Sequence, residues 1–170
     1  MKRKVLSLFL VVAMLLSLGI TASAAEPADD LSGAVVILHT NDVHGAIDGY
    51  AKAAALKKTY EDMGAYVLLM DAGDFSQGDP TVSASQGATA VELMNLAGYD
   101  VAAPGNHEFD YGYQNLSTLA GEAEFPIVAA NVLYNGKTAF EDNVTFTAPD
   151  GTKILSLIHI SEPTRLRRIS

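Results

Sequence analysis

Three short apolar segments, each followed at once by polar side chains, constrain the fold of this chain more than any other feature. Residues 35–38, 67–70 and 101–103 are continuously apolar, and the first of them is mostly β-branched. Strands buried on both faces of a parallel sheet have this composition. Helix-like stretches separate the three segments, so the sequence predicts an α/β fold with a parallel core.

The stretches between these apolar segments have the spacing of apolar residues that is typical of helices. Residues 53–63 predict an amphipathic helix that ends at Gly64, with an apolar face made of Ala53, Leu56, Tyr60 and Met63. A second predicted helix ends at Gly98 and presents Ala90, Leu93, Met94 and Ala97. Further along, the pattern predicts a helix at 113–120, a fourth strand at 126–130, and a hairpin around Asp150-Gly151.

Each of the first three predicted strands ends in side chains that suit a divalent metal. The segments are Asp42-Val43-His44, Gly73-Asp74 and Gly105-Asn106-His107-Glu108. Because the carboxyl ends of parallel strands meet at one edge of a sheet, we expect these side chains to converge. Taken singly, Asp or Asn at a strand end is more often a turn former or a helix cap. The threefold pattern favours one site.

The residue types suggest how two ions could be held. Asp42 and His44 are two apart, so on an extended backbone they would share a face. Carboxylate oxygen with imidazole nitrogen suits Zn, Mn, Fe(II) or Ni better than Ca or Mg. Asp74 could bridge two cations and Asn106 offers a neutral oxygen. Two such ions can activate water and clamp a phosphoryl group.

His107 and Asp110 are three apart at an expected helix start, so they can lie on one face. A carboxylate beside an imidazole favours its protonated form, which could stabilise transition-state charge or protonate a leaving oxygen. Asp71, Gln77 and Glu108 are candidates for supporting side chains around this site. For His39, on the first strand, we predict a structural hydrogen bond and no metal contact.

The overall charge limits the partners. The net charge is −9, but Lys2, Arg3 and Lys4 contribute +3 and the last ten residues +2, so residues 25–160 carry −14. So acidic a body is a poor match for nucleic-acid phosphate, whereas a small phosphorylated substrate held through metals is compatible with it. The chain has no cysteine, which excludes disulfides, thiol nucleophiles and Cys-based zinc sites.

The amino terminus predicts export. A basic start, an apolar run at 5–18 and the triplet Ala22-Ser23-Ala24 form the pattern of a signal peptide over residues 1–24, cleaved after Ala24. The alternative is a retained membrane anchor, but the run is short for a bilayer span of about 20 residues. We therefore expect a secreted, periplasmic or cell-surface protein without a stable membrane span. Residues 25–33 are predicted to be a disordered leader.

Taken together, the motifs resemble those of calcineurin-like metallophosphoesterases, in the branch of secreted 5'-nucleotidases and 2',3'-cyclic-nucleotide phosphodiesterases. The segments that carry the resemblance are 38–45, Asp71-Ala72-Gly73-Asp74 with Gln77-Gly78, and 105–110. The resemblance implies a sandwich of mixed β-sheets flanked by helices, with residues 34–155 as the N-terminal part of the domain. It also implies a hydrolase of nucleotides or related phosphate esters.

The same resemblance assigns roles to individual residues. Asp42 and His44 would hold one metal, Asp74 would bridge both, and Asn106 would hold the second. His107 and Asp110 would form a dyad near the leaving group.

The end of the chain departs from that family, which takes further ligands, mainly histidines, from later segments. After His107 there is only His159, inside the basic stretch 156–170, which resembles translated sequencing-adapter read-through. We expect residues 156–170 to be a non-native tail; a genuine short basic tail is the alternative. The competing function is thus a truncated, catalytically incompetent fragment that binds one metal weakly. A third alternative, a nucleotide-binding module without metal, has little support, because the sequence contains no glycine-rich phosphate-binding loop.

Overall fold

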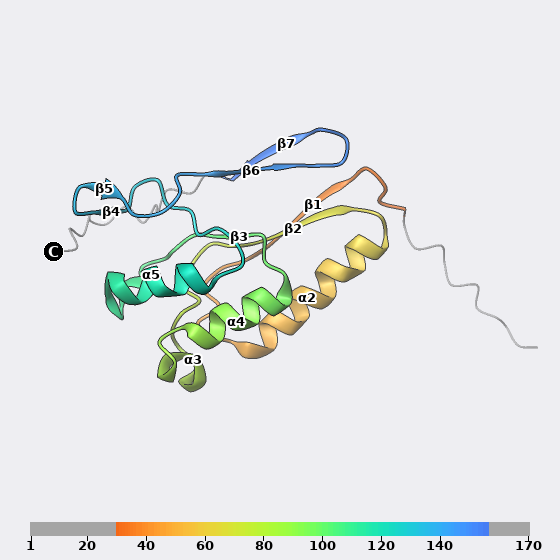
Figure 1. Ribbon diagram of the computed structural model, residues 1–170. Helices are drawn as coiled ribbons and strands as arrows, with labels where there is room; N and C mark the ends of the chain where they lie inside the picture. Colours follow the sequence, from red (N-terminus) through yellow and green to blue (C-terminus); the bar gives the residue numbers. More distant parts are fainter. Residues whose placement is uncertain (1–29, 157–170) are drawn as a thin grey trace, which may run out of the picture. The chain divides into compact units, whose positions relative to one another are not determined.

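The computed structural model describes residues 30–156 (Figure 1). The chain divides into Met1–Asp30 and Leu31–Ser170, and the description below concerns the second unit. The predicted signal peptide, most of the predicted leader, and residues 157–170 of the predicted non-native tail lie outside the described residues. None of the helices within residues 30–156 combines the length and the apolar character needed to cross a bilayer.

A parallel three-stranded sheet forms the centre of the unit, as the sequence predicts. Its strands are β1 (Val35–Thr40), β2 (Tyr66–Asp71) and β3 (Val101–Ala102), in the order β1-β2-β3. The register pairs Val36 with Val67 and Thr40 with Asp71, so the first two strands end side by side. The polar segments that follow them therefore leave the sheet at the same edge.

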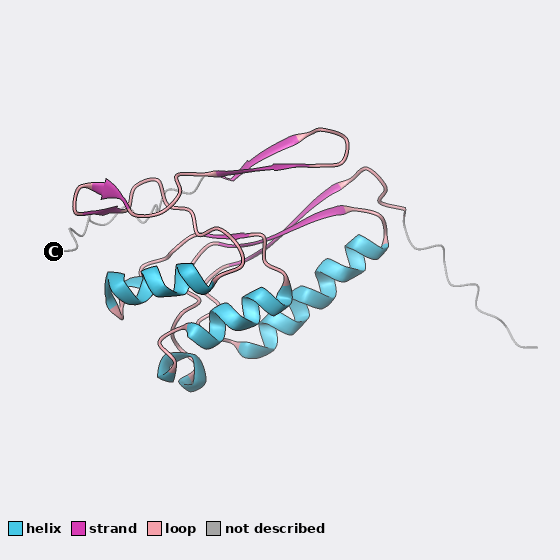
Figure 2. Cartoon of the chain, viewed as in Figure 1, coloured by secondary structure: helices cyan, strands magenta, loops and turns pink. Residues whose placement is uncertain are grey.

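Helices connect and cover these strands (Figure 2). They are α2 (Ile47–Asp62), α3 (Pro80–Ala84), α4 (Ala88–Ala97), the 3-10 turn η1 (His107–Phe109) and α5 (Gly112–Glu122). Helix α2 packs on β2 and on α4, and α4 packs on α5. The core between them contains Tyr50, Leu69, Phe75, Val91, Met94, Ala102 and Leu119, all nearly or fully buried. The strand-helix alternation confirms the predicted α/β class.

The second half of the unit is built from two antiparallel pairs. They are β4 (Leu133–Tyr134) with β5 (Lys137–Thr138), and β6 (Val144–Thr147) with β7 (Lys153–Ser156). The second pair confirms the hairpin predicted around Asp150-Gly151. The fourth strand predicted at 126–130 was wrong as a regular element, because the segment makes only two isolated bridges, from Ile127 to Ala102 and from Val128 to Glu141. β3 ends at Ala102, so it is too short to form a longer hydrogen-bonded ladder with that segment.

Helix α2 begins six residues earlier than predicted, and its inner face differs from the expected one. Leu56 is 46% exposed, whereas Tyr50 is buried and Ala53 and Ala54 pack against the core. Lys57 also faces inward, where its ammonium group donates to the Gly98 carbonyl (2.6 Å) and to the carboxylate of Asp100 (2.8 Å). The apolar pattern placed Lys57 on the opposite, polar side of the helix, so this inward-facing ion pair was not predicted.

The predicted disordered leader becomes ordered before residue 33. The Leu31 amide donates to the Met63 carbonyl, and the Ala34 amide donates to the Leu31 carbonyl, both at 2.8 Å. This turn ties the entry of β1 to the end of α2. A backbone that satisfies its polar groups on a neighbouring helix end has lost the freedom expected of a linker.

Candidate metal centre

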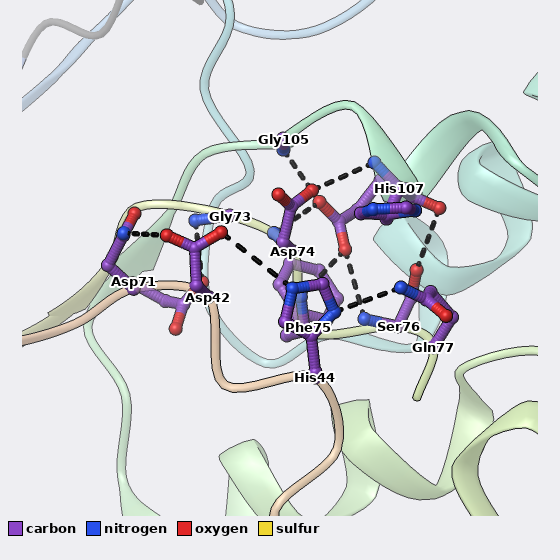
Figure 3. Close-up of polar contacts among 12 residues, drawn as sticks. Asp42, His44, Asp71, Gly73, Asp74, Phe75, Ser76, Gln77, Gly105 and His107 are labelled. Atoms are coloured by element: carbon purple, nitrogen blue, oxygen red, sulfur yellow. Dashed lines mark hydrogen bonds and ion pairs between the residues drawn. The ribbon is translucent and has the colours of Figure 1, made fainter. Parts of the chain in front are cut away.

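Three loops converge at the carboxyl edge of the sheet (Figure 3). The loop after β1 is bound to the loop after β2, because the amides of Asp42 and His44 donate to the carbonyls of Gly73 (3.1 Å) and Asp74 (2.9 Å). The loop after β3 joins through the His107 amide, which donates to a carboxylate oxygen of Asp74 at 2.8 Å. Asp74 therefore lies at the junction of all three loops.

The backbone at this junction is left-handed at three non-glycine residues. Asp42, His44 and Asp74 have φ angles of 53°, 47° and 62°. The extended backbone expected to bring Asp42 and His44 to one face was therefore wrong, because β1 already ends at Thr40. The two side chains still meet, with His44 Nε2 3.8 Å from Asp42 Oδ1. Left-handed non-glycine residues cost about 1 kcal/mol or more each and cluster at functional sites.

One group of side chains is arranged to hold an ion. Ligand atoms of His44, Asp74 and His107 all lie within 4.8 Å of one another. The two imidazole rings meet edge to face, with centroids 5.1 Å apart. Two histidines with one carboxylate form a donor set that suits divalent iron, zinc or manganese. His107, expected only as half of a dyad, is thus placed among the candidate ligands.

Each histidine is oriented by a partner on its other nitrogen. The side-chain nitrogen of Gln77, Nε2, lies 2.9 Å from His44 Nδ1, and an Asp110 carboxylate oxygen lies 2.7 Å from His107 Nδ1. As placed, the Gln77 nitrogen donates and His44 Nδ1 accepts. With the Gln77 amide oxygen turned to this contact, Nδ1 of His44 would donate and Nε2 would be free to bind a cation. The hydrogen bond that His107 Nδ1 donates to the Asp110 carboxylate raises the pKa of His107 above its ordinary value, so the ring is more readily protonated.

Asp42 and Asn106 occupy the rim of the site. Both are exposed, and the Asn41 side-chain amide donates to the Asp42 carboxylate. Asn106 directly precedes η1 at the start of the loop turn. His39 is exposed, and its side chain makes no hydrogen bond within residues 30–156. The structural hydrogen bond predicted for it was wrong, because its side chain points to the outer face of the edge strand.

Buried polar groups lie beneath the loops. Asp71 is 1% exposed, and this burial raises the pKa of its carboxyl to about 7, against hydrogen bonds from the Thr40 hydroxyl (2.5 Å) and the Gly73 amide (2.8 Å). The Tyr99 hydroxyl lies 2.8 Å from Thr40 Oγ1, and burial raises the pKa of Tyr99 to about 12. Sequence reasoning missed Thr40 and Tyr99; only the position of Thr40 at the end of the first predicted strand could have indicated it.

Glycine permits the closest approach between two of the loops. A Cβ on Gly73, whose φ is +105°, would collide with the backbone of Gly105. A Cβ on Gly105 would in turn collide with the carboxylate of Asp74. The two glycines that the sequence places beside Asp74 and Asn106 are therefore required for backbone-to-backbone contact at the site.

Comparisons with known proteins identify the family. A family model described as calcineurin-like phosphoesterase matches residues 35–169, a range that includes every candidate site residue and most of the stretch predicted to be a non-native tail. The chain is 35% identical over 144 residues to the 5'-nucleotidase of Homo sapiens, covering 74% of this chain and 24% of that protein. It is 38% identical over 122 residues to a snake venom 5'-nucleotidase of Gloydius brevicauda, covering 62% and 21%.

Solved structures resemble the fold. The 5'-nucleotidase precursor of Thermus thermophilus has a TM-score of 0.63 at 27% identity, with 71% of this chain and 27% of that one covered. The calcineurin-like phosphoesterase YfkN of Bacillus subtilis has a TM-score of 0.57 at 27% identity, with 70% and 45% covered. The chain spans about a quarter of the length of the curated relatives it matches.

Proposed function

The chain belongs to the calcineurin-like phosphoesterase family, and on that premise we propose that the intact protein is an exported two-metal phosphoesterase acting on nucleotides or related small phosphate esters. The observation that carries the proposal is the convergence of His44, Asp74 and His107, whose ligand atoms lie within 4.8 Å of one another. The 5'-nucleotidases among its relatives support the substrate class. The signal-peptide pattern supports export.

The residues present fit divalent ions of the Zn, Mn, Fe or Ni class. Asp74 has two carboxylate oxygens on the junction of the loops, so it is the residue suited to bridge two ions. His44 and Asp42 would complete one ion's coordination, and Asn106 would contribute an amide oxygen to the other. Bound there, such ions would supply stabilisation of phosphoryl charge and activation of water.

In this proposal His107 is a proton donor and not a ligand, because a protonated imidazole cannot bind a cation. Its Nδ1 donates to Asp110, which leaves Nε2 as the nitrogen available to a substrate and holds the pKa of the ring above its ordinary value. A protonated Nε2 can donate to the oxygen of a leaving group, or to the phosphoryl oxygens as charge develops on them. The dyad therefore supports proton donation to the ester oxygen that is released.

Hydrolysis assays test the proposal directly. We expect the full-length protein to hydrolyse a generic phosphomonoester and a nucleoside 5'-monophosphate once Mn²⁺ or Zn²⁺ is added. Asp74→Asn should abolish turnover, because an amide cannot bridge two cations as a carboxylate does. Asp62→Asn, an exposed site on α2, is the matched control. No turnover after titration with several divalent ions would refute the proposal.

Export is tested separately, by finding Ala25 at the start of the mature protein.

A second function is favoured by one observation on this chain itself. Within residues 30–156, only one group of three histidine or acidic side chains could hold an ion. We therefore propose, as the alternative, that the 170-residue chain alone binds one ion weakly and is inactive. Calorimetry with Mn²⁺ distinguishes the two, since tight uptake of two equivalents by this chain would contradict the alternative.

A further inference from the structure

Glu108 is a fully buried acid next to the candidate metal centre. Its side chain is 0% exposed, in the 3-10 turn η1. Oε2 accepts the amides of Asp74 (2.7 Å) and Gly105 (2.6 Å), and Oε1 accepts those of Phe75 (2.9 Å) and Ser76 (3.0 Å). Four N–H donors around two oxygens suit an ionised carboxylate, because a carboxylic acid would direct its own O–H at one of them.

These four donors come from two different loops. Three belong to the loop after β2, and the Gly105 amide belongs to the loop after β3. The last backbone hydrogen bond between the two segments runs from the Ala103 amide to the Asp71 carbonyl. Further along, no backbone–backbone hydrogen bond within residues 30–156 joins residues 73–78 to residues 104–109. Side chains join the two loops instead. Glu108 accepts three amides of the loop after β2, the Asp74 carboxylate accepts the His107 amide (2.8 Å), and the Ser76 hydroxyl donates to the His107 carbonyl (3.4 Å). The single Oε2 atom ties one amide of each loop together.

We propose that Glu108 is a positioning residue of the metal centre: its carboxylate fixes the separation between Asp74 on one loop and Asn106 with His107 on the other. The inference rests on the proposed function, since those three side chains are candidate ligands or proton donors there. Ligand geometry has to be held within about 0.5 Å for tight metal binding. Groups that orient ligands typically change metal affinity by about 10- to 100-fold when altered.

The close contact of Gly73 with Gly105 explains why the two loops held by Glu108, here called the Glu108 clamp, can change their separation very little. The loops already touch backbone to backbone there, so they cannot move closer. The four hydrogen bonds to Glu108 prevent them from moving apart. The separation of the ligands is therefore bounded from both sides, and the bond from the His107 amide to the Asp74 carboxylate (2.8 Å) adds to the same constraint.

Amide hydrogen exchange on the wild-type chain tests the clamp without any substitution. If one buried carboxylate holds both loops, the amides of Asp74, Phe75, Ser76 and Gly105 should exchange together, at rates within about threefold of one another after correction for intrinsic rates. Exchange of Gly105 more than about a hundredfold faster than that of Phe75 and Ser76 would overturn the proposal, because the loops would then open independently.

Three variants test the link to metal binding. Glu108→Gln keeps the shape but turns an NH₂ group toward two of the four amides, and Glu108→Asp keeps the charge but is one methylene too short to reach both loops. Met94→Ala is the control for a simple loss of stability, because Met94 is fully buried in α4, outside the three loops. Mn²⁺ affinity is measured by calorimetry, together with thermal unfolding and amide exchange.

We expect Glu108→Gln to weaken Mn²⁺ binding by about tenfold or more, with Glu108→Asp intermediate, and Met94→Ala to lower the unfolding temperature without changing affinity. Mn²⁺ affinity of Glu108→Gln within twofold of wild type would overturn the proposal. Should Glu108→Gln fail to fold, Glu108→Asp and the wild-type exchange rates decide. A wild-type chain that takes up no Mn²⁺ would contradict the proposed metal function, while the exchange rates still decide the role of Glu108.

Discussion

Substitution of Asp71 by asparagine should stabilise the folded chain at neutral and alkaline pH. Burial, aided by the charges of Glu108 and Asp74, raises the pKa of this carboxyl from 3.8 to about 7. Folding therefore forces an acid that water would ionise into a site that favours its neutral form. Asparagine is nearly isosteric, and its amide can accept from Gly73 and donate to the Thr40 hydroxyl.

The magnitude follows from proton linkage. Between pH 4 and 7 the folded chain keeps a proton that the unfolded chain has released, so the folded state binds more protons and stability falls as pH rises. The gap between 3.8 and about 7 corresponds to about 4 kcal/mol, at about 1.4 kcal/mol for each tenfold change in proton affinity. This contribution is fully present below pH 4 and is lost by pH 8. In Asp71→Asn no such loss occurs.

Urea unfolding at intervals from pH 4 to pH 8 measures the effect. EDTA should be present throughout, because a cation bound to the adjacent loops would favour ionised Asp71. The difference in free energy of unfolding between Asp71→Asn and wild type should rise from near zero at pH 4 to about 4 kcal/mol at pH 8. Asp62→Asn, on the exposed face of α2, should show no such rise. Parallel curves for wild type and Asp71→Asn would refute the reasoning.

Three further substitutions test the geometry of the site. Asp110→Asn should lower the pKa of His107 toward its ordinary value, because the hydrogen bond that favours the protonated ring is weakened; an NMR titration of the ring that is unchanged would contradict this. Gly73→Ala should destabilise the fold by about 1–3 kcal/mol, since φ is +105° and the new methyl would meet Gly105; thermal unfolding measures it, and an unaltered midpoint would be inconsistent with the close contact. Asp79→Ala should cost about 0.5–2 kcal/mol, because Asp79 caps α3 with its side chain; chemical denaturation provides the comparison.

Much of the fold follows from local pattern. The apolar runs at 35–38 and 67–70 carry no charge and alternate with helical stretches, so their burial in a parallel sheet can be read directly. The end of α4 at Gly98 was also predictable, since glycine readily adopts the left-handed conformation observed there. Convergence of Asp74 with the loops before and after it followed from the topology of parallel strands. These inferences depend only on neighbouring residues and on the sheet edge they reach.

Other features depend on contacts between distant residues. The inner face of α2 includes Lys57 because Asp100, 43 positions away, supplies its counter-charge. The spacing of apolar residues along a helix cannot predict that a lysine faces inward when its acidic partner lies elsewhere in the chain. The segment at 126–130 has the composition of a strand, but its neighbour β3 ends at Ala102 and pairs with it only at Ile127. In both cases the local structure depends on a residue that lies far away in the sequence, Asp100 for Lys57 and Ala102 for the segment at 126–130.

The sequence by itself determined which polar segments follow the strands, and so which side chains can meet at the edge of the sheet. Only the tertiary structure decided how they meet: the left-handed backbone at Asp42 and His44, the entry of His107 into the candidate ligand group, and the burial of Glu108 and Asp71 beneath the loops. The physical reason is that residue type and spacing set which elements form. Hydrogen-bond partners and burial are set by whatever lies opposite once those elements pack.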